Sequence, residues 1–231
     1  MTQKDGRDRL WLIWKQPTSR RQYVIGEMER NGGYFFRYCS DIHDLLTVGF
    51  IPLMPFNDTA KEYYSPTLFP IFSSRLPDRK RVDIKAILAK YELSDEYDEY
   101  ELLKASGARL PIDSFEFVDP IFIDIEGDIC RNFFIAGTRH YLDCYETCSK
   151  EEGIIAGTEL FFLPEPENQH DINAIKILNK DKQHIGYLPR YYSEAVLHYM
   201  EVGRTITCHV IERGEENLCD TCIRASLSIR A

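Results

Sequence analysis

The tripeptide Asn31-Gly32-Gly33 restricts the fold more than any other feature, because it stands between two runs of strand-forming residues. The runs RQYVIGEMER (21–30) and YFFRYC (34–39) are rich in aromatic and β-branched residues, and Asn-Gly between such runs is a strong hairpin signal. A third run, LWLIWKQ (10–16), precedes them. We therefore predict an antiparallel meander over residues 10–39, with Gly26 marking a bulge or a bend.

Prolines divide the following segment, residues 50–78, into short extended pieces. Apolar residues at helical spacing predict a short, proline-interrupted helix within 65–78 and an amphipathic helix over 82–93. Residues 95–107 are expected to form another helix that ends at Gly107, and SFEFV (114–118) a closing strand. The first half is thus an antiparallel meander with two to three helices.

The second half alternates strand-like runs with an amphipathic helix. Strands are expected over 131–138, 157–165, 173–189 (two strands around a turn at 179–182), 204–213 and 222–230, and the helix over 190–203. This order predicts a small, partly closed β-barrel with one or two helices. The whole chain is then an α+β protein with domains at 8–118 and 130–231 and a linker at 119–129.

Charge and apolar content limit the possible partners. The formal net charge is −9, which argues against a duplex-DNA coat, because such a coat needs a basic face. A small site that grips a nucleic-acid end by stacking remains possible. The sequence contains no run of about 18 apolar residues, so we predict no membrane span, and the N-terminal residues lack the core of a signal peptide. Seven irregularly spaced cysteines then suggest reduced thiols in a cytoplasm.

Four of the cysteines raise the question of zinc. Cys219 and Cys222 form a C-x-x-C, and Cys144 and Cys148 a C-x₃-C, so that the four sulfurs could hold a zinc ion. The gap of about 70 residues between the pairs is not a standard spacing. We therefore expect no metal and no other cofactor, with zinc kept as the alternative.

Three fragments of the second half carry a consistent binding chemistry at expected strand ends: GTRHY (137–141), EPENQHDINAIKI (165–177) and HIGYLPR (184–190). They supply forked cations for phosphate, flat rings for base stacking, and acceptors for a hydroxyl or a base edge. The cations are Arg139 and Arg190, the rings are those of His140, Tyr141, His170 and Tyr187, and the acceptors are Asn168 and Asp171. A structural interpretation stays open for each: Asn and Asp ahead of a strand often cap their own backbone, and a strand tyrosine often packs on its neighbours.

The segment E-P-x-N-x-x-D-x-N-A-I, followed about ten residues later by I-G-Y-L-P-R, resembles the HIRAN domain over residues 130–213. The resemblance implies a β-rich module that captures the 3′ end of single-stranded DNA, in which aromatic rings stack on the last bases, an Asp reads the 3′-hydroxyl and basic groups hold the phosphate. By motif position, these roles fall on Arg139, Tyr141, Asn168, Asp171, Tyr187 and Arg190. His140 and His170 stand where the family has stacking aromatics, so weaker end binding is expected.

The first half is similar to the N-terminal subdomain of HipA-type toxin–antitoxin kinases. The similarity covers residues 10–118 through V-I-G-E-M, Y-F-F-R-Y, I-P-L-M-P and L-F-P-I-F-S-S-R-L-P-D. It implies a protein partner, a HipA-like kinase supplied in trans. The sequence has no kinase catalytic loop, nucleophile motif or Gly-rich phosphate loop. We therefore expect a non-enzymatic adaptor that binds single-stranded DNA ends and a protein. The alternative is a purely protein-binding, antitoxin-like subunit without DNA binding.

Overall fold

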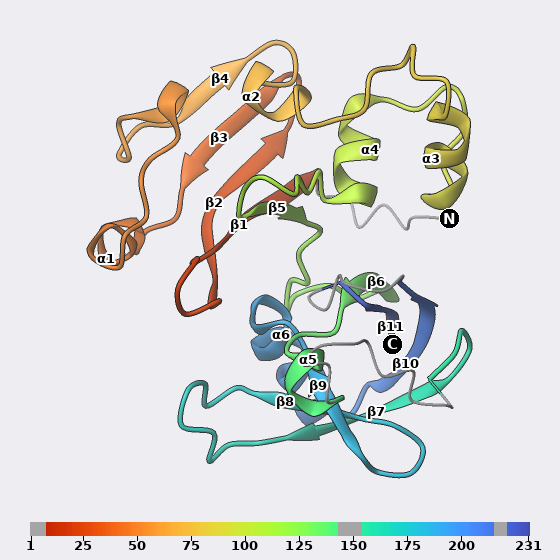
Figure 1. Cartoon of the computed structure of the whole chain (residues 1–231). Coiled ribbons are helices and arrows are strands. Elements are labelled where there is room, and N and C mark those ends of the chain that lie inside the picture. The colour runs from red at the N-terminus through yellow and green to blue at the C-terminus, as the bar shows by residue number, and fades with distance from the viewer. Residues whose placement is uncertain (1–7, 143–153, 215–220) are drawn as a thin grey trace. The chain divides into compact units, whose positions relative to one another are not determined.

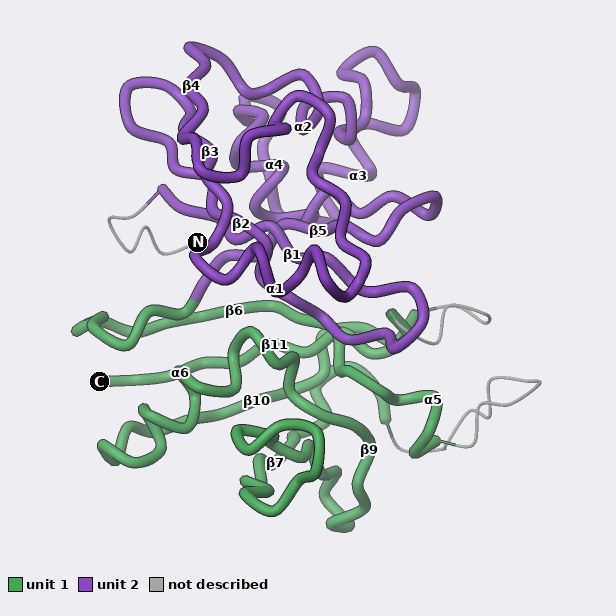
Figure 2. Tube along the Cα trace, turned by 90° about the vertical axis from the view of Figure 1, so that its left-hand side faces the viewer, with its two compact units in different colours: residues 1–5, 121–231 green, residues 6–120 purple. Residues whose placement is uncertain are grey.

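The computed structural model describes residues 8–142, 154–214 and 221–231. The chain divides into two compact units, one ending at Pro120 and the other beginning at Ile121 (Figure 2). Both units combine antiparallel sheets with short helices, so the predicted α+β class is confirmed.

The first unit is built on a five-stranded antiparallel sheet (Figure 1). Its strands are β1 (Arg9–Lys15), β2 (Gln22–Arg30), β3 (Tyr34–Tyr38), β4 (Tyr63–Ser65) and β5 (Phe115–Val118), in the order β4-β3-β2-β1-β5. The predicted meander is β1–β3. Leu12 lies opposite Gly26 and Ile13 opposite Val24, so Ile25 is the extra residue of a bulge. A Cβ added at Gly26 would lie 2.7 Å from the Arg37 carbonyl oxygen, which explains glycine at this place.

Short helices lie in the connections between β3, β4 and β5. They are α1 (Ile42–Thr47), the 3₁₀ turn η1 (Met54–Phe56), α2 (Pro70–Ser73), α3 (Ile84–Lys90) and α4 (Glu99–Ser106). The helices α2, α3 and α4 lie within the predicted segments, and Gly107 ends α4 at a φ of 68°. The sequence pattern does not predict α1. Phe36 packs against the rings of Phe56 and Phe72, with centroids 4.6 and 5.5 Å away, in a core that is largely aromatic.

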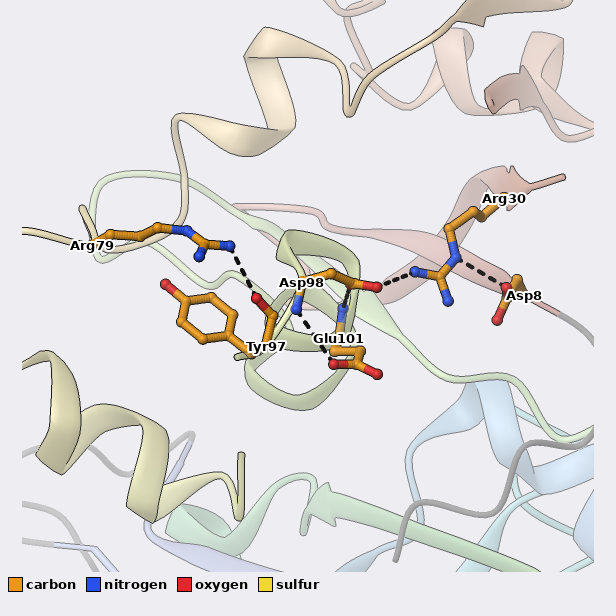
Figure 3. A network of polar contacts seen from close by, with 6 residues as sticks. All are labelled: Asp8, Arg30, Arg79, Tyr97, Asp98 and Glu101. Carbon is orange, nitrogen blue, oxygen red and sulfur yellow. Dashed lines mark hydrogen bonds and ion pairs between the residues drawn. The ribbon is translucent and has the colours of Figure 1, made fainter. Parts of the chain in front are cut away.

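A polar network fixes the start of α4 (Figure 3). The Asp98 carboxylate accepts a hydrogen bond from the Glu101 backbone N–H at 2.7 Å, and the Glu101 side chain accepts one from the Asp98 N–H at 3.4 Å. This capping box satisfies two orphan donors of the helix. Arg30 of β2 donates to Asp98 at 2.5 Å and to Asp8 at 2.9 Å, so the same carboxylate links α4 to the sheet.

The second unit is a curled six-stranded sheet. Its strands are β6 (Ile129–Phe134), β7 (Glu159–Pro164), β8 (Ile175–Leu178), β9 (His184–Tyr187), β10 (Thr205–Arg213) and β11 (Ile223–Arg230), in the order β6-β11-β10-β7-β8-β9. Ala136, just after β6, exchanges backbone hydrogen bonds of 2.8 and 2.9 Å with Tyr187 of β9. The two outer strands of the sheet therefore meet, as expected for the predicted partly closed barrel.

Two helices complete the second unit, α5 (Thr138–Tyr141) and α6 (Arg190–Glu201). Tyr192, Val196 and Tyr199 of α6 are buried in the core formed by the inward residues of the strands. Ile121 belongs to the same core, and the Tyr199 hydroxyl donates to the Phe122 carbonyl at 2.6 Å. Residues just after Pro120 are thus fastened to this unit. Among the described residues, no helix has the length and apolar character needed to cross a membrane.

Candidate nucleic-acid interface

The first of the three binding segments is a helical turn. A strand was expected to run to residue 138, but β6 ends at Phe134 and residues 138–141 form α5. The reason is Gly137, whose φ of 74° turns the chain out of the sheet immediately after the Ala136–Tyr187 pair. Thr138 is fully buried and accepts a hydrogen bond from the Cys222 thiol at 3.3 Å, which anchors the helix.

The second segment is a turn organised by its own side chains. Asn168 Oδ1 accepts from the backbone N–H groups of His170 (2.9 Å) and Asp171 (3.1 Å), and Asp171 Oδ1 accepts from the Asn173 N–H (3.1 Å). The turn-forming interpretation of Asn168 and Asp171 is therefore correct. The second carboxylate oxygen of Asp171, Oδ2, makes a different contact. It lies 3.4 Å from Nε of Arg190 at the start of α6.

Glu165 joins this turn to the third segment. Its carboxylate accepts hydrogen bonds from Asn168 Nδ2 at 2.7 Å and from the Tyr187 hydroxyl at 2.9 Å, and it pairs with Lys176 at 2.6 Å. The Lys176 ammonium first, then Asn168 and Tyr187, lower the pKa of Glu165 from 4.5 to about 2. Glu165 is therefore a fixed negative charge beside Tyr187.

Three rings from two segments form an aromatic cluster. Tyr141 of α5 lies with its ring centroid 3.9 Å from that of His184 and 5.7 Å from that of Tyr187, and the last two are 4.7 Å apart. Tyr141 keeps 38% of its surface exposed. Burial, together with the Lys176 charge, lowers the pKa of His184. Burial, with Tyr141 and Glu165 nearby, raises the pKa of Tyr187. Both shifts favour the uncharged forms of His184 and Tyr187.

The remaining candidates lie on the surface. Arg139 and His140 are exposed on α5, and neither side chain makes a hydrogen bond or ion pair with another residue that the structure describes. His170 is exposed on its turn, and Arg190 is 46% exposed despite its contact with Asp171. An unpaired guanidinium on the surface is available for a phosphate.

The structure therefore brings Tyr141, Asn168, Asp171, Tyr187 and Arg190 into one set of contacts. Arg139 and His140 lie on α5 without a side-chain hydrogen bond or ion pair to that set among the described residues, whereas the His170 backbone N–H donates to Asn168. Sequence reasoning overlooked three members of the set, Glu165, Lys176 and His184. Glu165 and His184 open the quoted fragments EPEN and HIGY, so the signal was present. Lys176 carries no signal of its own, because its role follows from its place opposite Tyr187 across β8 and β9.

The zinc alternative falls mostly on undescribed positions. Cys144, Cys148 and Cys219 lie outside the described residues. Cys222 is buried, with its thiol against Thr138. Among the residues that the structure describes, no group of three or more His, Cys, Asp or Glu side chains is placed to hold a metal.

One comparison with known proteins gives a family match that lies within the second unit. Residues 130–230 match the model of the HIRAN domain family. Among solved structures, the HIRAN domain of human HLTF is 20% identical, with 45% of this chain and 73% of that chain covered and a TM-score of 0.32. A Lactobacillus plantarum protein is 20% identical, with 45% and 97% covered and a TM-score of 0.30.

The HLTF HIRAN domain in its DNA-bound conformation, solved by NMR, is 18% identical over 46% of this chain and 74% of that chain, with a TM-score of 0.28. The comparison with curated proteins gives no match. The kinase-like resemblance of the first half stays a prediction. The sequence motif, the curled sheet and the family match together identify residues 130–230 of this chain as a HIRAN domain.

Proposed function

We propose that this chain is a non-enzymatic adaptor whose HIRAN domain binds the 3′ end of single-stranded DNA. The observation that carries the proposal is the aromatic cluster of Tyr141, His184 and Tyr187, which is linked through Asn168 to the Asp171–Arg190 pair. Rings that stack on bases and a carboxylate that accepts from a hydroxyl are the groups an end-binding site needs.

The electrostatics favour a strand end over a continuous duplex. Residues 130–231 contain 15 acidic and 11 basic residues, a formal difference of −4. Such a surface gains little from displacing counterions along a duplex. Stacking contributes roughly 1–3 kcal/mol per base and needs no basic face. Unpaired bases are therefore the better ligand.

The two carboxylates favour a hydroxyl terminus over a phosphate terminus. Glu165 is charged at neutral pH, and Asp171 Oδ2 lies 3.4 Å from Nε of Arg190. A terminal 3′-phosphate brought to this place adds a like charge, whereas a 3′-hydroxyl can donate to Asp171 Oδ2. Arg139, which has no side-chain partner among the residues that the structure describes, is then suited to the phosphate one nucleotide from the end.

The test is a fluorescence titration of the whole chain with matched oligonucleotides that end in a 3′-hydroxyl or a 3′-phosphate. We expect tighter binding of the hydroxyl form, and a ratio that falls toward one in Asp171→Asn, which keeps the shape of the side chain. Arg139→Ala should weaken both forms, while Arg81→Ala in the first unit serves as the control for loss of an exposed arginine. Equal binding of both termini by the unaltered protein would remove the end-reading role.

We further propose that the first unit binds a protein, with a HipA-like kinase as the partner. Ile51 and Met54, in the proline-rich connection between α1 and β4, are 79% and 84% exposed, and exposed apolar side chains of this kind favour a protein interface. A pull-down with the product of the neighbouring gene should succeed with the unaltered chain and fail with Ile51→Asp/Met54→Asp. Retained capture by that variant would contradict this surface.

The excess of acidic over basic residues in the HIRAN domain also favours a second candidate function, an antitoxin-like subunit that binds protein alone. The same two experiments separate the candidates. Partner capture that is unaffected by Arg139→Ala, together with no binding of any oligonucleotide, would favour the protein-only subunit.

A further inference from the structure

The outward face of β7, β8 and β9 continues the aromatic cluster across the sheet. Cross-strand partners share a face, and the pairs are Phe161 with Leu178, Leu178 with His184, Leu163 with Lys176, and Lys176 with Tyr187. Their neighbours Leu160, Ile177 and Ile185 point into the core. We call the outward residues the outer strip: Phe161, Leu163, Lys176, Leu178, His184 and Tyr187.

The outer strip leaves large apolar groups in solvent. Phe161 is 45% and Leu163 49% exposed, on the part of β7 that pairs with β8. The strip is continuous with the proposed end-binding site, because His184 and Tyr187 belong to both. A ligand that ends at Asp171 and covers Tyr187 therefore meets His184 and then Phe161 as it leaves.

The far end of the outer strip carries two cations. The turn between β8 and β9 is held by the buried Asn179, whose Oδ1 accepts from the backbone N–H groups of Asp181 (3.0 Å) and Gln183 (2.9 Å). Lys180 and Lys182 project from this turn, exposed and without a side-chain contact to any residue in the described part of the chain. The hydrogen-bonded turn fixes the backbone from which both lysine side chains extend, so that binding does not have to order this backbone.

We propose that the outer strip is a track for the single strand behind its 3′ end, with Phe161 and His184 as stacking groups and Lys180 and Lys182 as phosphate contacts. The proposal rests on the proposed function of the end-binding site. Three features select a nucleic acid: continuity with that site, flat faces along the path, and cations at its outer end.

The distance along β9 from Tyr187 to the turn is about 10–16 Å, at ~3.3 Å per residue. That length corresponds to roughly three to five stacked nucleotides at ~3.4 Å each.

The test is fluorescence anisotropy with 3′-hydroxyl oligonucleotides of two to ten nucleotides, labelled at the 5′ end. Affinity should rise with length up to about five nucleotides and then level off. Phe161→Ala should weaken binding of the octamer at least about fivefold and leave the dinucleotide unchanged. Lys180→Ala/Lys182→Ala should likewise weaken binding of the octamer and leave binding of the dinucleotide unchanged.

Matched controls come from the first unit. Tyr64→Ala removes an aromatic ring that is 59% exposed, and Lys80→Ala/Lys85→Ala removes two exposed lysines. Neither control should change the affinity for any length.

Three results would overturn the track. Length-independent binding with an intact preference for the 3′-hydroxyl would refute the track and leave the end-binding function standing. No binding at any length would refute both. Self-association that is lost in Phe161→Ala, with unchanged oligonucleotide binding, would assign the outer strip to a second copy of the chain.

Discussion

Glu165 illustrates at the scale of one residue how a single charge organises the site. Its carboxylate holds Lys176, Asn168 and Tyr187 together, and these partners lower its pKa from 4.5 to about 2. A carboxylate with a lowered pKa in the folded state stabilises that state above its unfolded pKa. This contribution is lost as the pH falls from about 4.5 to about 2.

We therefore expect Glu165→Gln to lower the free energy of unfolding at pH 7 and to reduce the dependence of stability on pH between 4.5 and 2. Urea denaturation at pH 7, 4.5 and 2.5 measures both effects. Glu167→Gln is the control, because Glu167 is exposed two residues away and contacts no described side chain. Equal pH profiles for the Glu165 variant and the unaltered protein would contradict this role.

Residue types alone predicted that Asn168 and Asp171 form a turn and that Tyr187 lies in a strand, because turn formers and strand aromatics have local signatures. They could not identify the Glu165–Tyr187 contact. The two residues are 22 positions apart and meet only because the register of β8 and β9 places Lys176 opposite Tyr187. Register depends on the sum of many side-chain contacts, which no short motif encodes.

At the scale of elements, the position of β9 depends on a glycine. Gly186 has a φ of 149°, and a Cβ added there would lie 2.6 Å from both the Ala136 carbonyl oxygen and Cγ2 of Ile135. Only the missing side chain lets β9 approach Ala136 and close the curled sheet.

Gly186→Ala should therefore destabilise the chain by about 2–4 kcal/mol, the sum of backbone strain and a clash with the Ala136 carbonyl oxygen and the Ile135 side chain. It should also weaken oligonucleotide binding, since β9 carries His184 and Tyr187. Denaturation in urea and the anisotropy titration measure the two effects. Gly127→Ala, where an added Cβ has no neighbour within 4 Å, is the matched control and should be nearly neutral.

Elements with strong local signals were predictable from the sequence. The Asn-Gly-Gly hairpin, the αL end of α4 at Gly107 and the amphipathic α6 each follow from turn or helix chemistry that acts within a few residues. The four-residue helix α5 was not predictable, because one turn has no periodicity and Gly137 could equally continue a strand. Yet α5 supplies Tyr141 to the aromatic cluster.

At the scale of the whole molecule, net charge sets how binding responds to salt. The chain carries −9, so its long-range field repels a polyanion, and added salt screens this repulsion. Cations that contact phosphates have the opposite effect, because added salt weakens the binding that they support. If Arg139, Lys180 and Lys182 each neutralise one phosphate, counterion release from a single strand gives a slope of about −2 in log K against log salt, at roughly −0.7 per phosphate.

We therefore expect a measured slope between zero and about −2 for an octamer with a 3′-hydroxyl, over roughly 50–300 mM salt. Lys180→Ala/Lys182→Ala should bring the slope closer to zero by about 1.4, whereas Phe161→Ala should lower the affinity and leave the slope unchanged, because stacking releases no counterions. Lys80→Ala/Lys85→Ala serves as the control for a change in net charge alone. A slope steeper than about −4 would mean that phosphate contacts dominate, and a nucleic-acid surface of that kind needs more cations than the outer strip and α5 provide.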